Sequence, residues 1–142
     1  MKAFEIAVLT ALVVQLYKGL VAWVEAGRPN IRRFVETGGM PSSHSAAVAA
    51  LTTTVGMTEG VMSALFGVTL FFSLIVMYDA AGLRRAAGRQ AALLNRIMAE
   101  KEGRARNERQ LFELLGHTPF EVLVGALLGV AAAFLWNHWF TV

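Results

Sequence analysis

Two histidines in this sequence lie beside residues that begin helices. His44 follows the Pro-Ser-Ser run at 41–43, and His117 precedes the Thr-Pro-Phe-Glu run at 118–121. Serine and threonine cap helices well, proline suits the first helical position, and a glutamate three residues after the threonine completes a capping box. A helix N-terminus favours an anion, and an imidazole exchanges protons near neutral pH. The two segments together indicate a site for phosphate or another anion.

Charged side chains gather near the same helix ends. Asp79, Arg84 and Arg85 lie at the end of the third apolar stretch of the chain, and Glu121 lies at the start of the fourth. The planar fork of arginine suits bidentate contacts with phosphate, and ionisable residues beside apolar stretches are candidates for function. Simpler interpretations stay open for each piece. The serine and threonine segments can be helix caps alone, and the arginines can be charge anchors at a membrane surface.

The composition indicates that these residues belong to a membrane protein. Of the 142 residues, 56% are hydrophobic and 16% are charged, and the mean hydropathy is +0.52, which is too apolar for an ordinary soluble domain of this size. A helix needs about 20 apolar residues to cross a hydrocarbon core of about 30 Å. Stretches that approach this length run over residues 3–26, 43–58, 61–81 and 119–140, and the second is barely long enough. We therefore expect one all-α integral membrane domain over residues 1–142 with about four transmembrane helices.

A basic segment at 83–116 separates the third and fourth stretches. Its first half has an apolar face and an arginine-rich face, which predicts an amphipathic helix. With four spans, this segment and the loop at 27–42 share one side of the membrane and hold eleven of the thirteen Lys and Arg residues. The positive-inside rule makes that side cytoplasmic. We therefore expect both termini outside and the histidine site facing the cytoplasm, in a cell inner membrane.

The composition also limits the binding partners and the kinds of chemistry that we expect for this chain. The chain has no cysteine, which excludes disulfides and thiolate chemistry, and its net charge of +3 lies in blocks that do not argue for nucleic acid. Gly125 and Gly129 form a pattern of small residues that suits close helix packing. Four spans leave few walls around a pocket. We therefore also consider a homodimer that completes or buries the site, with these glycines and the small residues of the second stretch as packing surfaces.

Three ordered motifs resemble the divergent branch of the type-2 phosphatidic acid phosphatase superfamily. They are Gly-Gly-Met-Pro-Ser-Ser-His-Ser at 38–45, Asp-Ala-Ala-Gly-Leu-Arg-Arg-Ala-Ala-Gly-Arg-Gln at 79–90 with Asn95, and Leu-Leu-Gly-His-Thr-Pro-Phe-Glu-Val at 114–122. The resemblance covers nearly the whole chain. It implies a phosphomonoesterase that works through a phosphohistidine without a metal or other cofactor.

The resemblance also assigns roles to the candidate residues. His117 would be the nucleophile, Glu121 would orient it in place of the family's aspartate, and His44 would protonate the leaving alcohol. Ser42 and Ser43, with neighbouring backbone amides, would hold phosphate oxygens. These chemical roles agree with those of imidazole and of hydrogen-bond donors in known phosphoryl and acyl transfer.

The cationic residues follow the family pattern less closely. Lys18 matches the lysine of the family's first motif, near the end of the first stretch. Ser43 stands where the family has glycine, and the arginine expected six residues before the nucleophile falls on Leu111. Arg84 and Arg85 are the candidates to supply that missing positive charge, and Asp79 belongs to the same catalytic cluster.

The sequence therefore predicts a membrane phosphatase that hydrolyses a lipid phosphate monoester or diphosphate, with a phospholipid or an isoprenoid phosphate as substrate. An alternative is a non-catalytic membrane module that binds anionic lipid head groups or a partner protein through the same basic pocket. A third interpretation makes metal ligands of the four acid and imidazole side chains, which are His44, Asp79, His117 and Glu121. The neighbouring arginines oppose that interpretation because they repel a cation.

Overall fold

The computed structural model describes most of the chain and all of its apolar stretches. The described residues are 3–27, 39–101, 111 and 116–140. Several predictions concern residues outside these ranges. They include the basic residues of the first loop, at 28–33, and the polar, charged stretch at 102–110.

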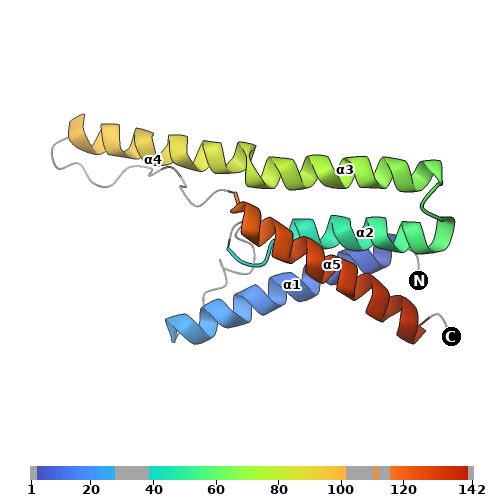
Figure 1. Ribbon diagram of the computed structural model, residues 1–142. Coiled ribbons are helices and arrows are strands. Elements are labelled where there is room, and N and C mark those ends of the chain that lie inside the picture. Colours follow the sequence, from blue (N-terminus) through green and yellow to red (C-terminus); the bar gives the residue numbers. More distant parts are fainter. Residues whose placement is uncertain (1–2, 28–38, 102–110, 112–115, 141–142) are drawn as a thin grey trace.

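Five helices make up the regular structure of the described residues (Figure 1). They are α1 (Ala3–Ala26), α2 (Ser43–Glu59), α3 (Ala64–Ala81), α4 (Leu83–Lys101) and α5 (Pro119–Phe140). The all-α membrane fold class is confirmed. The third helix begins three residues later than predicted because Ser63 caps it, accepting a hydrogen bond at its Oγ from the backbone N–H of Phe66 at 3.1 Å.

Three helical segments are long and apolar enough to cross a membrane. They are α1, the continuous stretch from Ala64 to Ala99 that includes α3, and α5. The 17 residues of α2 correspond to about 26 Å of helix, slightly less than the hydrocarbon core. Nevertheless α1, α2, α3 and α5 run back and forth along the bundle, so the start of α1 and the end of α5 lie at the same end (Figure 1). This arrangement supports four spans, which stay a prediction.

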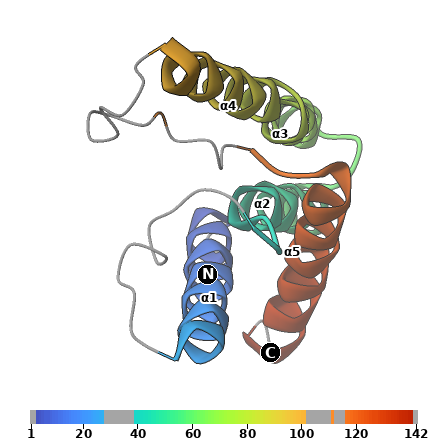
Figure 2. The same cartoon turned by 90° about the vertical axis from the view of Figure 1, so that its left-hand side faces the viewer.

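The central helix is α2, which packs against α1, α3 and α5 (Figure 2). Apart from Val55, its buried side chains are those of alanine, serine and threonine, so the neighbouring backbones can come close. The buried hydroxyls of Thr52 and Ser73 lie 2.7 Å apart in a hydrogen bond, and Ser73 also donates to the carbonyl of Val48 at 3.0 Å. These bonds join α2 to α3 in a region where water is scarce.

The glycines of α5 make the closest approach to α2. A Cβ atom at Gly129 would fall on the carbonyl oxygen of Ala46, and one at Gly125 on the carbonyl oxygen of Ser42. These glycines therefore pack α5 against α2 within one chain. They were the candidate packing surface between two subunits, and that surface is filled by the protein's own α2.

The fourth helix continues almost in line with α3 and projects beyond the other helices (Figure 1). The two helices meet at Gly82, whose N–H donates to the carbonyl of Tyr78 at 2.8 Å. The prediction of an amphipathic helix in the first half of the basic segment is confirmed by α4. The cytoplasmic location of this segment stays a prediction.

Candidate functional site

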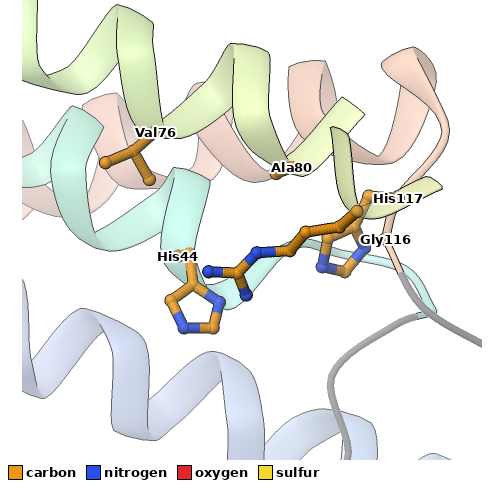
Figure 3. A pocket seen from close by; sticks show the side chains of 6 residues that line it. His44, Val76, Ala80, Gly116 and His117 are labelled. Carbon is orange, nitrogen blue, oxygen red and sulfur yellow. The ribbon is translucent and has the colours of Figure 1, made fainter. Parts of the chain in front are cut away.

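The end of α3 and the starts of α2 and α5 meet at one end of the bundle (Figure 1). A cavity of about 20 Å³ lies among them, lined by His44, Val76, Ala80, Arg84, Gly116 and His117. The rings of His44 and His117 project into the same space, one from the first turn of α2 and one from the segment that leads into α5 (Figure 3). The structure thus brings together two histidines that are 73 residues apart in the sequence (117 − 44).

His117 is held by contacts on both its ring and its backbone. The side chain is only 5% exposed, and its Nδ1 lies 3.2 Å from Oε2 of Glu121. An ionised carboxylate only accepts hydrogen bonds, so a neutral ring that donates to Glu121 carries its hydrogen on Nδ1. The backbone N–H of His117 donates to the carbonyl of Ala80 at 2.9 Å, which ties the segment to the end of α3.

The carboxylate of Glu121 also completes the predicted capping box. The same Oε2 accepts a hydrogen bond from the N–H of Thr118 at 3.0 Å, and the N–H of Glu121 donates to the hydroxyl of Thr118 at 3.2 Å. The helix-cap interpretation of this segment is therefore confirmed. One carboxylate both starts α5 and orients the histidine beside it.

Burial sets the protonation of His117. Desolvation lowers the pKa of this imidazole most, and the positive charge of Lys18 lowers it further. Glu121 and a backbone hydrogen bond to Gly39 raise it in part. The net effect is a pKa below the ordinary value of histidine. A neutral ring is therefore the dominant form near neutral pH.

The positive side chains near the cavity differ in their placement. Arg84 lines it and donates from Nε to Oδ2 of Asp79 at 2.8 Å, so Asp79 acts on the cavity by holding Arg84. Lys18 lies half-buried on α1, where its charge acts on both histidines. Arg85 is exposed, and its backbone packs under Gly116.

The two serines before His44 have different environments. Ser42 is fully buried, and its Oγ accepts hydrogen bonds from the N–H of Ser45 at 3.3 Å and from the hydroxyl of Ser45 at 3.0 Å. Its own N–H donates to the carbonyl of Glu121 at 3.3 Å, which joins the starts of α2 and α5. The hydroxyl of Ser42 therefore serves as a helix cap. Ser43 is partly exposed beside His44.

Two residues of the motifs to which the sequence assigned no role make specific contacts in the structure, and one of them, Gly116, lines the cavity. Gly116 has a φ of +84°, and a Cβ there would collide with the backbone of Arg84 and Arg85, so only glycine fits. Asn95 forms two hydrogen bonds with the backbone of Leu111. The glycine directly before His117 was a visible signal of a close approach, whereas the partner of Asn95 has no local signal in the sequence.

A metal centre receives no support from the described residues. Among them, no group of three or more His, Asp and Glu side chains is placed to hold a metal ion. Asp79 pairs with Arg84 and does not join the two histidines.

Comparisons with known proteins place this chain in a family. The sequence matches the model described as the Divergent PAP2 family over residues 1–132. A membrane protein of Bacillus subtilis (strain 168), named Uncharacterized membrane protein YuiD, is 41% identical over 73% of this chain and 73% of its own. No solved structure matches the chain.

Proposed function

Because this chain belongs to the divergent branch of the PAP2 (type-2 phosphatidic acid phosphatase) family, we propose that it is a membrane-embedded phosphatase. Its substrate is a lipid phosphate monoester or diphosphate, and the reaction proceeds through a phosphohistidine without a metal. The observation that carries this proposal is the pair of histidines in one cavity, with Nδ1 of His117 held by Glu121. Such a pair supplies a nucleophile and a separate proton donor.

The proposed reaction has two steps. Nε2 of His117 attacks the phosphorus, the bond between phosphorus and the leaving oxygen breaks, and His44 gives its proton to that oxygen. The product alcohol leaves, and the phosphoryl group stays on His117. A water molecule then attacks the phosphorus, His44 takes a proton from the water, and the bond to Nε2 breaks to release phosphate. Glu121 stabilises the positive charge that the ring of His117 carries between the two steps.

Cationic groups stabilise the negative charge of the transferring phosphoryl group. Arg84 lines the cavity and is fixed by Asp79, and Lys18 is close enough to influence both histidines. Ser43 and the backbone N–H groups of the first turn of α2 offer further donors. These groups contribute most when their donors are already aimed at the phosphate before it binds.

A lipid substrate is supported by the other wall of the cavity. Val76 and Ala80 line it from α3, so the group attached to the phosphate meets apolar side chains. Val76 lies one turn further into the apolar helix than Ala80, so the apolar wall continues toward the interior of the bundle. A phospholipid or an isoprenoid phosphate fits this division, with its head group among the basic residues. The positive-inside pattern supports a site at the cytoplasmic face.

The test is phosphate release by the purified protein in detergent from a panel of lipid monophosphates, lipid diphosphates and a water-soluble phosphate ester. We expect release from lipid substrates that survives a chelator, is blocked by orthovanadate and is lost in His117→Ala. An acid-quenched reaction with a labelled substrate should trap an acid-labile phosphoryl group on His117. Folded wild-type protein that releases no phosphate from any substrate would refute the proposal.

The same lipids also test the alternative function, a membrane module that binds anionic lipid without catalysis. That function needs the cations of the cavity but not the nucleophile, so anionic lipid should bind equally well to wild type and to His117→Ala. The position of Arg84 agrees with both functions. Its guanidinium, paired with Asp79, can bind a phosphate head group whether or not the phosphate is then hydrolysed. Binding without release therefore identifies the module.

A further inference from the structure

The cavity that holds the two histidines is too small for a whole lipid. Its volume is about 20 Å³, and a single water molecule already needs about 10–15 Å³. A hydrocarbon chain therefore does not fit inside it. The chain of a lipid bound there has to extend outside the cavity, along a helix that leads from it into the membrane.

The neighbours of α2 leave one of its sides open beside the cavity. The helices α1, α3 and α5 all pack on α2, and α5 also contacts α1 and α3, but no Cα atom of α1 lies within 8 Å of one in α3. Figure 1 shows that α1 lies close to α2 near its own N-terminus and diverges from it toward the end that carries the histidines. In Figure 3 the ring of His44 projects from α2 into the space between α3 above and α1 below. The open side of α2 thus begins at His44.

An aliphatic stripe continues from His44 along this open side. Ala47, Val48 and Leu51 follow His44 at intervals of three, four and seven residues, which is the spacing of side chains on one face of a helix. All three are partly exposed, and none has a polar side chain. Val55, one turn beyond Leu51 on the same face, is only 4% exposed. The open stripe (Ala47, Val48 and Leu51) therefore extends about 10 Å from His44 and ends where Val55 is covered.

Positive charge gathers at the end of the stripe that His44 occupies. Arg84 lines the cavity together with His44. Lys18 extends from α1 toward Gly39, where a Cβ atom would lie 3.9 Å from its Cε. Val76 of α3 gives the same cavity an apolar wall. A ligand with an anionic head and an apolar tail matches this division of charge, with its head among the cations and its tail on the stripe.

We propose that the open stripe of α2 binds the hydrocarbon chain of the lipid whose phosphate lies at the two histidines. The chain leaves the cavity at His44, lies on α2 between α1 and α3, and points toward the middle of the membrane. The proposal rests on the proposed function for its kinetic consequence, because the chain belongs to the substrate. Binding of the chain to α2 is independent of any hydrolysis.

The first experiment locates the chain without requiring turnover. The probe is a long-chain alkyl phosphonate, which is not hydrolysed, with a diazirine in its alkyl chain. Wild type, Ala47→Trp and Ala131→Trp are irradiated with the probe in the same detergent micelles, and mass spectrometry identifies the labelled peptides. Ala131 is an exposed alanine of α5, so its variant is the matched control for the added indole.

We expect the label on wild type to concentrate on the α2 peptide that holds the open stripe, and an excess of probe without the diazirine should remove it. Ala47→Trp should lose most of this label because the indole occupies the stripe, whereas Ala131→Trp should keep it. Label spread evenly over the outer faces of α1, α3 and α5, and insensitive to competition, would show ordinary lipid contacts and overturn the proposal. Label that is absent from α2 would also overturn it.

A cysteine in the stripe tests whether a second copy of the chain covers it instead. The protein has no cysteine of its own, so an oxidised Leu51→Cys protein forms a disulfide only between two chains. We expect it to stay monomeric on a non-reducing gel and to react with a maleimide more slowly when the phosphonate is bound. Rapid formation of a disulfide-linked dimer would assign the stripe to a second copy and overturn the proposal.

The third experiment compares kcat/KM for a long-chain lipid phosphate and for a water-soluble phosphate ester in the same micelles. Ala47→Trp should lower the value for the lipid at least about tenfold, as a misfit of one or a few methylene groups does in an apolar site. The value for the soluble ester and the inhibition by orthovanadate should stay close to wild type. Ala131→Trp should leave all three unchanged.

An equal loss of activity toward both substrates in folded Ala47→Trp would overturn the proposal, because the indole then acts on the phosphate site. If Ala47→Trp does not fold, Ala47→Leu carries the same comparisons with less added volume. Wild-type protein that hydrolyses neither substrate would refute the proposed function, and the labelling experiment would still decide where the chain lies.

Discussion

Replacing Glu121 by glutamine separates the two tasks of that carboxylate. In the structure, Oε2 of Glu121 accepts from the N–H of Thr118 at 3.0 Å and lies 3.2 Å from Nδ1 of His117. Glutamine has the same length and still completes a capping box, because its amide oxygen accepts the same backbone bond. It lacks the negative charge. Glu121→Gln should therefore keep the helix start and weaken only the stabilisation of a positively charged imidazole.

The size of the effect follows from the burial of the pair. The exposed fractions of the two side chains are 5% for His117 and 22% for Glu121, so solvent screens their interaction little. A hydrogen bond to a charged group contributes about 1.5–3 kcal/mol, against about 0.5–1.5 kcal/mol for a neutral one. The difference, about 1–1.5 kcal/mol, corresponds to a fall in kcat of about 5- to 15-fold. If the glutamine amide instead donates to Nδ1, the lone pair on Nε2 is lost and the fall approaches about 10⁴-fold.

The dependence of the rate on pH gives the same variant a second signature. Burial lowers the pKa of His117, and Glu121 offsets part of that shift by favouring the protonated ring. Without the carboxylate, the pKa of His117 should fall further. Because the neutral ring is the nucleophile, the acid limb of the kcat/KM profile should move to lower pH in Glu121→Gln. NMR titration of the labelled imidazole measures the same pKa without turnover.

The assay compares kcat, the pH profile and thermal unfolding for wild type, Glu121→Gln and Thr118→Ala. Thr118→Ala removes the hydroxyl that receives the N–H of Glu121 at 3.2 Å but leaves the contact with His117. It should lower stability by about 1 kcal/mol, as the loss of a helix cap does, with little effect on kcat. A Glu121→Gln protein with wild-type kcat and an unshifted acid limb would refute the role given to this carboxylate.

Two further predictions concern packing and phosphate binding. Gly129→Leu places a side chain against the carbonyl of Ala46 and should destabilise the protein by about 1–3 kcal/mol, measured by unfolding in detergent. The control is Gly67→Leu, which should have little effect because a Cβ there meets nothing within 4 Å. Equal stability of the two variants would contradict the close packing of α5 on α2. Arg84→Ala should weaken inhibition by vanadate about 10- to 100-fold, as loss of a charged hydrogen bond does, because Arg84 lines the cavity. Arg85→Ala should leave the inhibition constant close to that of wild type, and the reverse order would exchange the roles of the two arginines.

The helices were predictable because their signals are local. Long apolar runs separated by glycine, proline and charge gave α1 and α5 at the predicted bounds and α2 within one residue. The alternation of arginines with apolar residues gave α4. The start of α3 was predicted at Val61, because the apolar run begins there. The cap at Ser63 and its hydroxyl bond to the carbonyl of Gly60 at 2.8 Å moved the start to Ala64.

The sequence was enough to predict which residues belong to the candidate site, but not which contacts they make. Alternating helix directions were sufficient to place His44 and His117 at the same end of the bundle. The burial of Ser42 was not predictable, because it depends on how closely α5 approaches α2 at Gly125. The pairing of Asn95 with Leu111 was equally hidden, since it depends on where a distant segment crosses α4.

The central position of α2 has a consequence for how this protein is made. It is the shortest of the four helices that line the bundle, and its interior face carries hydroxyls such as those of Ser45, Thr52 and Thr54. Such a helix gains less from lipid than its neighbours do, and the glycine face that receives its backbone belongs to α5, which leaves the ribosome after α1, α2, α3 and α4. During membrane insertion, α2 therefore acquires its final surroundings only after α5 has been made. The same later segment brings His117 to the cavity, so a chain that stops before residue 117 has neither a sheltered α2 nor a second imidazole in the cavity.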